Sequence, residues 1–99
     1  MDIAREIRKA IDTGSVIVGT DKSLKAVKTD EAKLVIYAAN CKKESKDDLM
    51  HYTKMANIPT LEFVGTGMDL GMVCGKPFIV SMLAVISPGD SSILAAEGA

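Results

Sequence analysis

The sequence predicts an α/β protein, a three-layer α/β/α sandwich in which helices alternate with the strands of a mixed sheet of about four strands. Helical and strand-like patterns alternate from the first residues almost to the last. The apolar runs 33–39 and 78–86 are nearly continuous and strand-sized, which is typical of strands covered on both faces. No repeat or linker divides the chain, so residues 1–99 are expected to form a single domain.

The first half of the chain contains two predicted helices and two predicted strands. Residues 2–12 form a helix with Asp2 as its N-cap and one apolar face, made of Ile3, Ile7, Ala10 and Ile11. A strand at 15–18 leads through a tight turn into a short helix that ends near residue 28. After a polar connector, the run 33–39 is the predicted central strand.

The second half continues the alternation. Apolar residues at helical spacing between 49 and 56 predict a helix that begins at Ser45 or Asp47, is capped by Asn57 and is stopped by Pro59. The alternating stretch 60–64 predicts a strand near the edge of the sheet, with one face exposed.

A short helix and a last strand complete the predicted fold. Thr66 and Asp69 have the form of a capping box, and Gly71 inside that helix indicates a close backbone contact. A loop then leads to a buried strand at 78–86. The last few residues are expected to fray.

Composition excludes several classes of protein. Neither a signal peptide nor an apolar run of membrane-spanning length is present, which predicts a cytoplasmic protein with no membrane partner. Cys41 and Cys74 do not form a CxxC pair, and the single histidine, His51, lies inside a helical pattern. We therefore expect no metal, no cofactor and no catalytic nucleophile.

Charge is unevenly distributed, although the formal net charge is only −1. Residues 19–46 contain seven lysines and four acids, a net charge of +3. From residue 56 onward a single lysine stands against four acids, a net charge of −3. The positive part of the molecule therefore surrounds the first strand-to-helix turn.

That turn, residues 19–25, is the stretch around which the chain is organised. Gly19 accommodates a positive φ, and Thr20 or Asp21 is suited to cap the following helix. Lys22 and Lys25 would then lie beside the positive end of that helix, an arrangement that favours anions. Taken alone, the stretch is equally compatible with a capped turn carrying solvated lysines.

Two further loops strengthen the interpretation as a binding edge. Asn40 ends the central strand and precedes Lys42; its amide suits a nucleobase edge, and a helix cap or turn residue is the other interpretation. The third loop runs from Val73 through Gly75, Lys76 and Pro77 to Phe78. Phe78 either stacks on a nucleobase or packs into the core as the first residue of the last strand.

With these residues the sequence resembles the family of large-subunit ribosomal protein thirty of archaea and eukaryotes, within the wider group of kink-turn RNA-binding proteins. The resemblance extends from about residue 3 to residue 94. The matching stretches occur in family order and spacing, and they are Gly19-Thr20-Asp21-Lys22-Ser23, Ala32 to Asn40, Ile58-Pro59, Leu70-Gly71, Gly75-Lys76-Pro77-Phe78 and Pro88-Gly89-Asp90-Ser91.

The resemblance implies a non-catalytic protein of translation that stabilises a kinked rRNA internal loop. It places the turn 19–25 on sheared G·A pairs and phosphates, Asn40 on the RNA, the loop 73–78 around a flipped base, and Lys46 near the backbone. Asp21 departs from the Asn, Arg or Lys that relatives tend to have. It either caps the helix or accepts a hydrogen bond from a guanine edge.

The implied partners are ribosomal RNA and, through assembly, other ribosomal proteins, with a monomer expected when the protein is free. Two other functions remain open at this point. One is a kink-turn binder of a guide-RNA particle, and the other is a small enzyme that holds a phosphorylated ligand in the same turns. No general base or paired carboxylates accompany those turns, which disfavours the enzyme and any small-molecule substrate.

Overall fold

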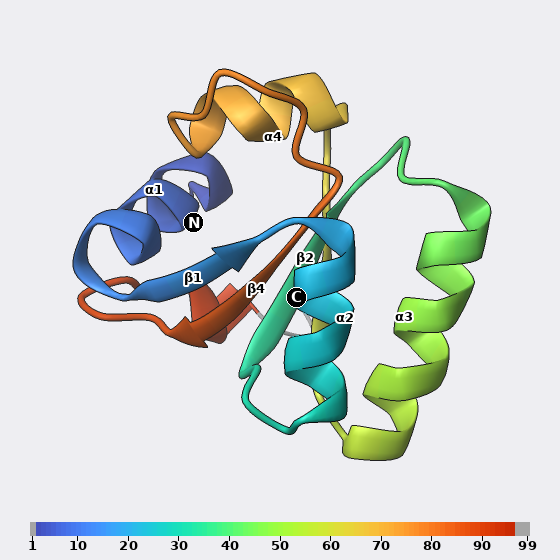
Figure 1. The fold of residues 1–99 in the computed structure, drawn as a ribbon. Coiled ribbons are helices and arrows are strands. Elements are labelled where there is room, and N and C mark those ends of the chain that lie inside the picture. The colour runs from blue at the N-terminus through green and yellow to red at the C-terminus, as the bar shows by residue number, and fades with distance from the viewer. Residues whose placement is uncertain (1, 97–99) are drawn as a thin grey trace.

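The computed structural model describes residues 2–96, and these form an α/β/α sandwich (Figure 1). The elements follow in the order α1 (Ile3–Thr13), β1 (Ser15–Val18), α2 (Thr20–Lys28), β2 (Leu34–Ala38), α3 (Lys43–Ala56), β3 (Thr60–Phe63), α4 (Gly67–Val73), β4 (Met82–Ser87) and the 3-10 helix η1 (Ile93–Ala96). This order confirms the predicted alternation of helices and strands. The expected fraying at the C-terminus concerns residues 97–99, which lie outside the described part of the chain.

The four strands form one mixed sheet in the order β1-β4-β2-β3. β4 runs antiparallel to both of its neighbours, β1 and β2, whereas β2 and β3 are parallel. β2 is therefore internal and all five of its residues are buried, as its continuous apolar run predicts. β3 is an edge strand, which confirms that prediction.

The two faces of the sheet are covered by different helices. Figure 1 shows α1 and α4 on one side of the sheet and α2 with α3 on the other. Leu34, Ile36 and Ala38 of β2 belong to the core on the α1 and α4 side, whereas Val35 and Tyr37 belong to the core on the α2 and α3 side. The alternation of side chains along one strand thus holds both helical layers to the sheet.

Several helix ends follow the local sequence signals. The Asp2 side chain accepts a hydrogen bond of 3.2 Å from the Arg5 amide at the start of α1. Thr66 and Asp69 form the predicted capping box of α4. Asn57 caps α3 in the left-handed conformation, with φ 60° and ψ 39°.

Two predicted helix starts are wrong. α2 begins at Thr20 with Gly19 as its N-cap, and no side chain of Thr20 or Asp21 caps it. Gly19 has φ 121°, so the turn closes through the glycine backbone one residue earlier than predicted. α3 begins at Lys43, before the predicted Ser45 or Asp47.

The predicted strand 78–86 begins four residues too early, because β4 starts at Met82. Residues 78–80 pack against α4 instead of joining the sheet. The Val80 amide donates a hydrogen bond of 2.9 Å to the Gly67 carbonyl. A Cβ on Gly71 would collide with the Phe78 carbonyl oxygen, so the close approach predicted at Gly71 is present, and it packs this segment on α4 before β4 begins.

Candidate nucleic-acid interface

The first loop of the candidate interface ends at the N-terminus of α2. Because no side chain caps α2, its first backbone amides remain available to an anion. The side chains of Asp21 and Lys22 are exposed around this end, Thr20 is half-buried, and Lys25 is exposed further along, in the last turn of α2. Lys22 beside the uncapped amides favours a phosphate, and the exposed Asp21 carboxylate is the opposing charge on this turn. The predicted placement of Lys25 beside the same end is wrong, because about one and a half turns of α2 separate it from these amides.

The second loop is held in place by Asn40. Its side-chain oxygen Oδ1 accepts a hydrogen bond of 2.9 Å from the backbone amide of Gly67, the first residue of α4. The Ala39 amide donates a hydrogen bond of 2.9 Å to the Gly65 carbonyl beside it. Asn40 therefore does cap a helix, namely α4 rather than the helix that follows it, while the residue itself stays exposed.

The third loop presents an exposed aromatic ring. Gly75 has φ 70° and Phe78 is 56% exposed, so Phe78 is not a core residue. The Lys76 amide donates a hydrogen bond of 2.9 Å to the Gly71 carbonyl, which folds the loop back on α4. The Arg8 guanidinium of α1 lies against Gly75 and supports the loop from the other side.

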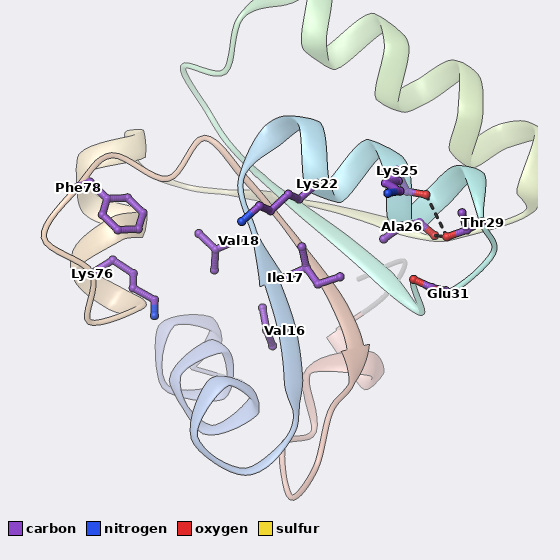
Figure 2. Close-up of a pocket in the computed structure, with 10 residues that line it drawn as sticks. All are labelled: Val16, Ile17, Val18, Lys22, Lys25, Ala26, Thr29, Glu31, Lys76 and Phe78. Atoms are coloured by element: carbon purple, nitrogen blue, oxygen red, sulfur yellow. Dashed lines mark hydrogen bonds between the residues drawn. The ribbon is translucent and has the colours of Figure 1, made fainter.

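Two hollows show which of these residues come together. A groove of about 660 Å³ brings Lys22 and Lys25 of α2 to face Lys76 and Phe78 of the third loop across β1 (Figure 2). A smaller hollow of about 300 Å³ joins Thr20 and Asp21 to Cys41 and Lys42, and so joins the first loop to the second. All three loops thus lie along one edge of the molecule.

Two predicted site residues are placed less directly. Val73 is the last residue of α4, half-buried against the core, so it positions the third loop rather than presenting a free surface. Lys46 lies in the first turns of α3 with its Nζ 5.6 Å from the centre of the Tyr37 ring. This cation–π contact holds the lysine near the second loop.

The two thiols lie in surroundings that do not activate them. Burial raises the pKa of the Cys74 thiol to about 11, despite the opposing charges of Lys76 and Arg8. Burial also raises the pKa of Cys41. Both thiols are therefore protonated near neutral pH, and neither has the thiolate character of a nucleophile. His51 is exposed on α3 and contacts the Tyr52 ring edge-on, at 5.2 Å between ring centres.

Two further classes of feature do not occur in the described part of the chain. Between residues 2 and 96, no group of three or more His, Cys, Asp or Glu side chains is placed to hold a metal ion. Over the same residues, no helix combines the length and the apolar character needed to cross a membrane.

Comparison with known proteins decides the family. The model of the ribosomal protein L7Ae/L30e/S12e/Gadd45 family matches residues 1–95. The chain belongs to this family. This agrees with the resemblance that the ordered motifs of the sequence indicate.

Curated relatives within this family match almost the whole chain. A protein of Methanococcus vannielii named large ribosomal subunit protein eL30 is 50% identical over 94 residues, which are 95% of this chain and 90% of that protein. The protein of the same name from Methanothermobacter thermautotrophicus is 45% identical over 98 residues, 99% of this chain and all of that protein.

The fold also agrees with a solved structure. A Bacillus halodurans protein of unknown function superposes with a TM-score of 0.82 and covers 96% of this chain and 94% of its own. At 24% sequence identity this likeness concerns the fold alone.

Sequence reasoning missed one part of the surface of this family member, an apolar patch beside the third loop. Met68 and Met72 of α4 are 63% and 72% exposed, and Ile79 is 63% exposed. With Lys76, Pro77 and Phe78 they line a hollow of about 310 Å³. The spacing of the two methionines by four residues in a helix is the signal that pairs them on one face. That this face points outward follows only from the packing of Leu70 and Gly71 inward.

Proposed function

We propose that this chain is a structural protein of the large ribosomal subunit that binds and stabilises a kinked internal loop of rRNA. It acts as one RNA-binding domain, has no catalytic role, and works in the cytoplasm within the ribosome. The observation that carries the proposal is the convergence of three loops on one edge, in a chain whose relatives are named large ribosomal subunit proteins.

Each loop has a distinct task in the proposed complex. The uncapped start of α2, with Lys22, binds phosphates and sets the orientation of the RNA, and Lys25 in the last turn of α2 extends the basic surface. The amide of Asn40 donates to an unpaired base edge, since its oxygen is already engaged with Gly67. Phe78 offers a stacking face to a base that has left the helix.

The remaining predicted residues extend this contact. Gly19 and Gly75 give the two turns their positive φ angles, and Thr20 and Asp21 line the hollow between the first and second loops. Lys42, Lys46 and Lys76 add positive charge around the RNA backbone, while Val73 and Pro77 shape the third loop. Other ribosomal proteins are partners by assembly, and the free protein is a monomer.

The two other functions fit less well. A guide-RNA particle would use the same loops, but the relatives that match most of the chain carry a ribosomal name. An enzyme acting on a phosphorylated ligand would need a general base near α2, and the two hollows beside α2 offer the single carboxylates of Asp21 and Glu31, one in each, rather than a pair.

Footprinting of the purified protein on large-subunit rRNA tests the proposal. We expect protection confined to an internal loop with sheared G·A pairs and one flipped base. Protection spread evenly over helical RNA, or none at all, would show that the three loops do not form a site for kinked RNA.

A further inference from the structure

The free edge of β1 lies in the groove that also contains Lys22 and Phe78. β1 pairs only with β4 among the strands of residues 2–96, so its other side ends the sheet. The groove of about 660 Å³ follows this side and includes Val16, Ile17 and Val18 in its lining (Figure 2). The three consecutive residues show that the groove runs along the strand edge rather than over one face of the sheet.

The hydrogen-bond register shows which backbone groups point into that edge. The Gly19 amide donates a hydrogen bond of 3.0 Å to the Met82 carbonyl of the β4 segment. In an antiparallel pair, opposed residues alternate between bonded and unbonded pairs. Since Ile17 is opposite Ala84 and Val18 opposite Leu83, Ile17 bonds to β4. The N–H and C=O groups of Val16 and Val18 therefore point away from β4.

Bonds on the far side of β4 agree with this register. The Ala38 amide of β2 donates a hydrogen bond of 2.9 Å to the Ser81 carbonyl. The same alternation turns Leu83 toward β2, opposite Ile36. Leu83 is thus directed away from Val18, which leaves the backbone groups of Val18 without a partner in the sheet formed by the described residues.

The side chains around this edge are apolar at the base and basic at the rim. Val16 and Val18 pack on the α1 side of the sheet and Ile17 packs on the α2 side. The rim carries three lysines, Lys22 and Lys25 on one side and Lys76 on the other, against the single carboxylate of Glu31. The excess of positive charge on both sides favours an acidic ligand.

We propose that the β1 edge is a docking site for an extended, acidic segment of a partner protein, which pairs with Val16 and Val18 and adds a fifth strand to the sheet. Because side chains alternate between the two faces of a strand, its acidic side chains would face Lys22 and Lys25 on the α2 side, and its apolar side chains would face Val16 and Val18 on the other side. This proposal goes beyond RNA binding and does not rest on it. Lys22, Lys25 and Lys76 also belong to the proposed RNA contact, so the acidic strand and RNA would compete for these lysines, whereas only the strand would use the backbone edge of β1.

Other occupants fit the edge less well. A second copy of the chain would bring β1, Ser-Val-Ile-Val, which has no acid to answer the lysines and places its own lysines against them. RNA would meet the lysines but would leave the row of backbone groups and the aliphatic base unused. Base stacking in this groove would have a single partner, because Phe78 is the one aromatic ring in its lining.

The test uses a soluble peptide of about six residues in which glutamate and valine alternate, long enough to span the edge of β1. Binding is followed by the amide NMR signals of the complete protein. We expect shifts concentrated at Val16 and Val18, and binding at least tenfold weaker for a peptide of alternating lysine and valine. A glutamate–valine peptide methylated on alternate backbone nitrogens keeps the charge but loses the strand pairing, and should also bind at least tenfold more weakly.

Two variants of the protein complete the experiment. Val16→Pro removes one outward N–H at an edge position, where proline is tolerated, and should weaken peptide binding at least tenfold. The matched control Val16→Thr keeps that N–H and a similar shape, so it should bind like the wild type. If Val16→Pro does not fold, the methylated peptide on the wild type remains decisive.

Each contrary outcome overturns the proposal in a defined way. Absence of binding at peptide concentrations up to about 1 mM, the weak end of specific affinity, would mean that the β1 edge does not accept a further strand. Equal binding of the methylated peptide would show charge attraction alone. A loss of kinked-RNA affinity in Val16→Pro as large as its loss of peptide affinity would assign the β1 edge itself to RNA. Peptide binding without any RNA binding would refute the proposed function and leave this proposal standing.

Discussion

The side-chain oxygen of Asn40 accepts a 2.9 Å hydrogen bond from the backbone amide of Gly67, 27 positions further along the chain. This bond ties the turn after β2 to the start of α4, and α4 in turn holds the segment that carries Phe78. The second and third loops are therefore mechanically connected, and Asn40 is itself an exposed residue. Asn40 combines a structural bond with a proposed RNA contact.

This double role predicts different results for two substitutions. Asn40→Ala leaves the buried Gly67 without its acceptor, so it should cost about 1–3 kcal/mol of stability. It should also reduce RNA affinity by about 1–3 kcal/mol, the scale of a good base contact. Asn40→Asp keeps an acceptor for Gly67 and loses the donor, so it should fold normally and bind RNA weakly. Chemical denaturation measures the stability of each variant, and an RNA titration measures its affinity. Wild-type affinity in Asn40→Asp would show that the Asn40 amide does not donate to a base.

The lysines beside α2 should contribute by neutralising phosphates. Lys22→Ala or Lys25→Ala should weaken RNA binding and lower the slope of log affinity against log salt by roughly 0.7 to 0.9 for each phosphate that the variant no longer neutralises. Lys54→Ala is the matched control, because Lys54 is exposed in the last turn of α3, outside the three loops. Titrations at several salt concentrations measure the slopes. If the slopes of both variants equal that of the control, the two lysines are solvated and do not touch RNA.

Substitution of Phe78 distinguishes stacking of its ring on RNA from packing of its ring in the core. Because the residue is 56% exposed, Phe78→Ala should cost less than about 2 kcal/mol of stability, below the penalty for deleting a buried phenylalanine. Its affinity for a kinked internal-loop RNA should fall at least tenfold, since a stacked base is worth about 1–3 kcal/mol. Phe78→Trp should retain most of the affinity. A stable Phe78→Ala protein with unchanged affinity would leave the third loop without an aromatic contact to RNA.

Substitution of Gly71 tests the packing of the third loop against α4. Alanine has the higher helix propensity by about 1 kcal/mol, yet a Cβ here would collide with the Phe78 carbonyl. Gly71→Ala should therefore destabilise the protein by about 1–3 kcal/mol and also weaken RNA binding, because Phe78 must move. Met72→Ala, at the exposed neighbouring position, should change stability by no more than about 0.5 kcal/mol. Greater stability of Gly71→Ala in denaturation would contradict the packing described here.

Local patterns sufficed to predict most of the fold. The continuous apolar run of β2 indicates a strand that is buried on both faces. The helix caps at Asp2, Asn57 and Thr66 act within one helical turn, so each can be predicted without knowledge of the rest of the chain. The strand predicted from residue 78 failed for the opposite reason. Phe78 and Ile79 are apolar enough for a strand, but a contact with the backbone of α4 holds them outside the sheet.

The candidate site was predictable as three separate loops but not as an assembled surface. Lysines after a strand and a glycine are visible in the sequence, whereas the bond from Asn40 to Gly67 and the contact of Arg8 with Gly75 join distant segments. The exposure of Met68 and Met72 and the free edge of β1 likewise depend on the strand order and on how the helices pack. These features need tertiary structure.

Binding to two matched RNAs tests the central claim most directly. One RNA contains an internal loop with sheared G·A pairs and an unpaired base, and the other replaces that loop with Watson–Crick pairs at the same length and charge. We predict at least tenfold tighter binding to the kinked RNA at physiological salt, with Asn40 and Phe78 required for the difference and Lys22 contributing to both. Equal affinity for the two RNAs would contradict the account, because it would reduce the three loops to a basic surface without specificity for a kink.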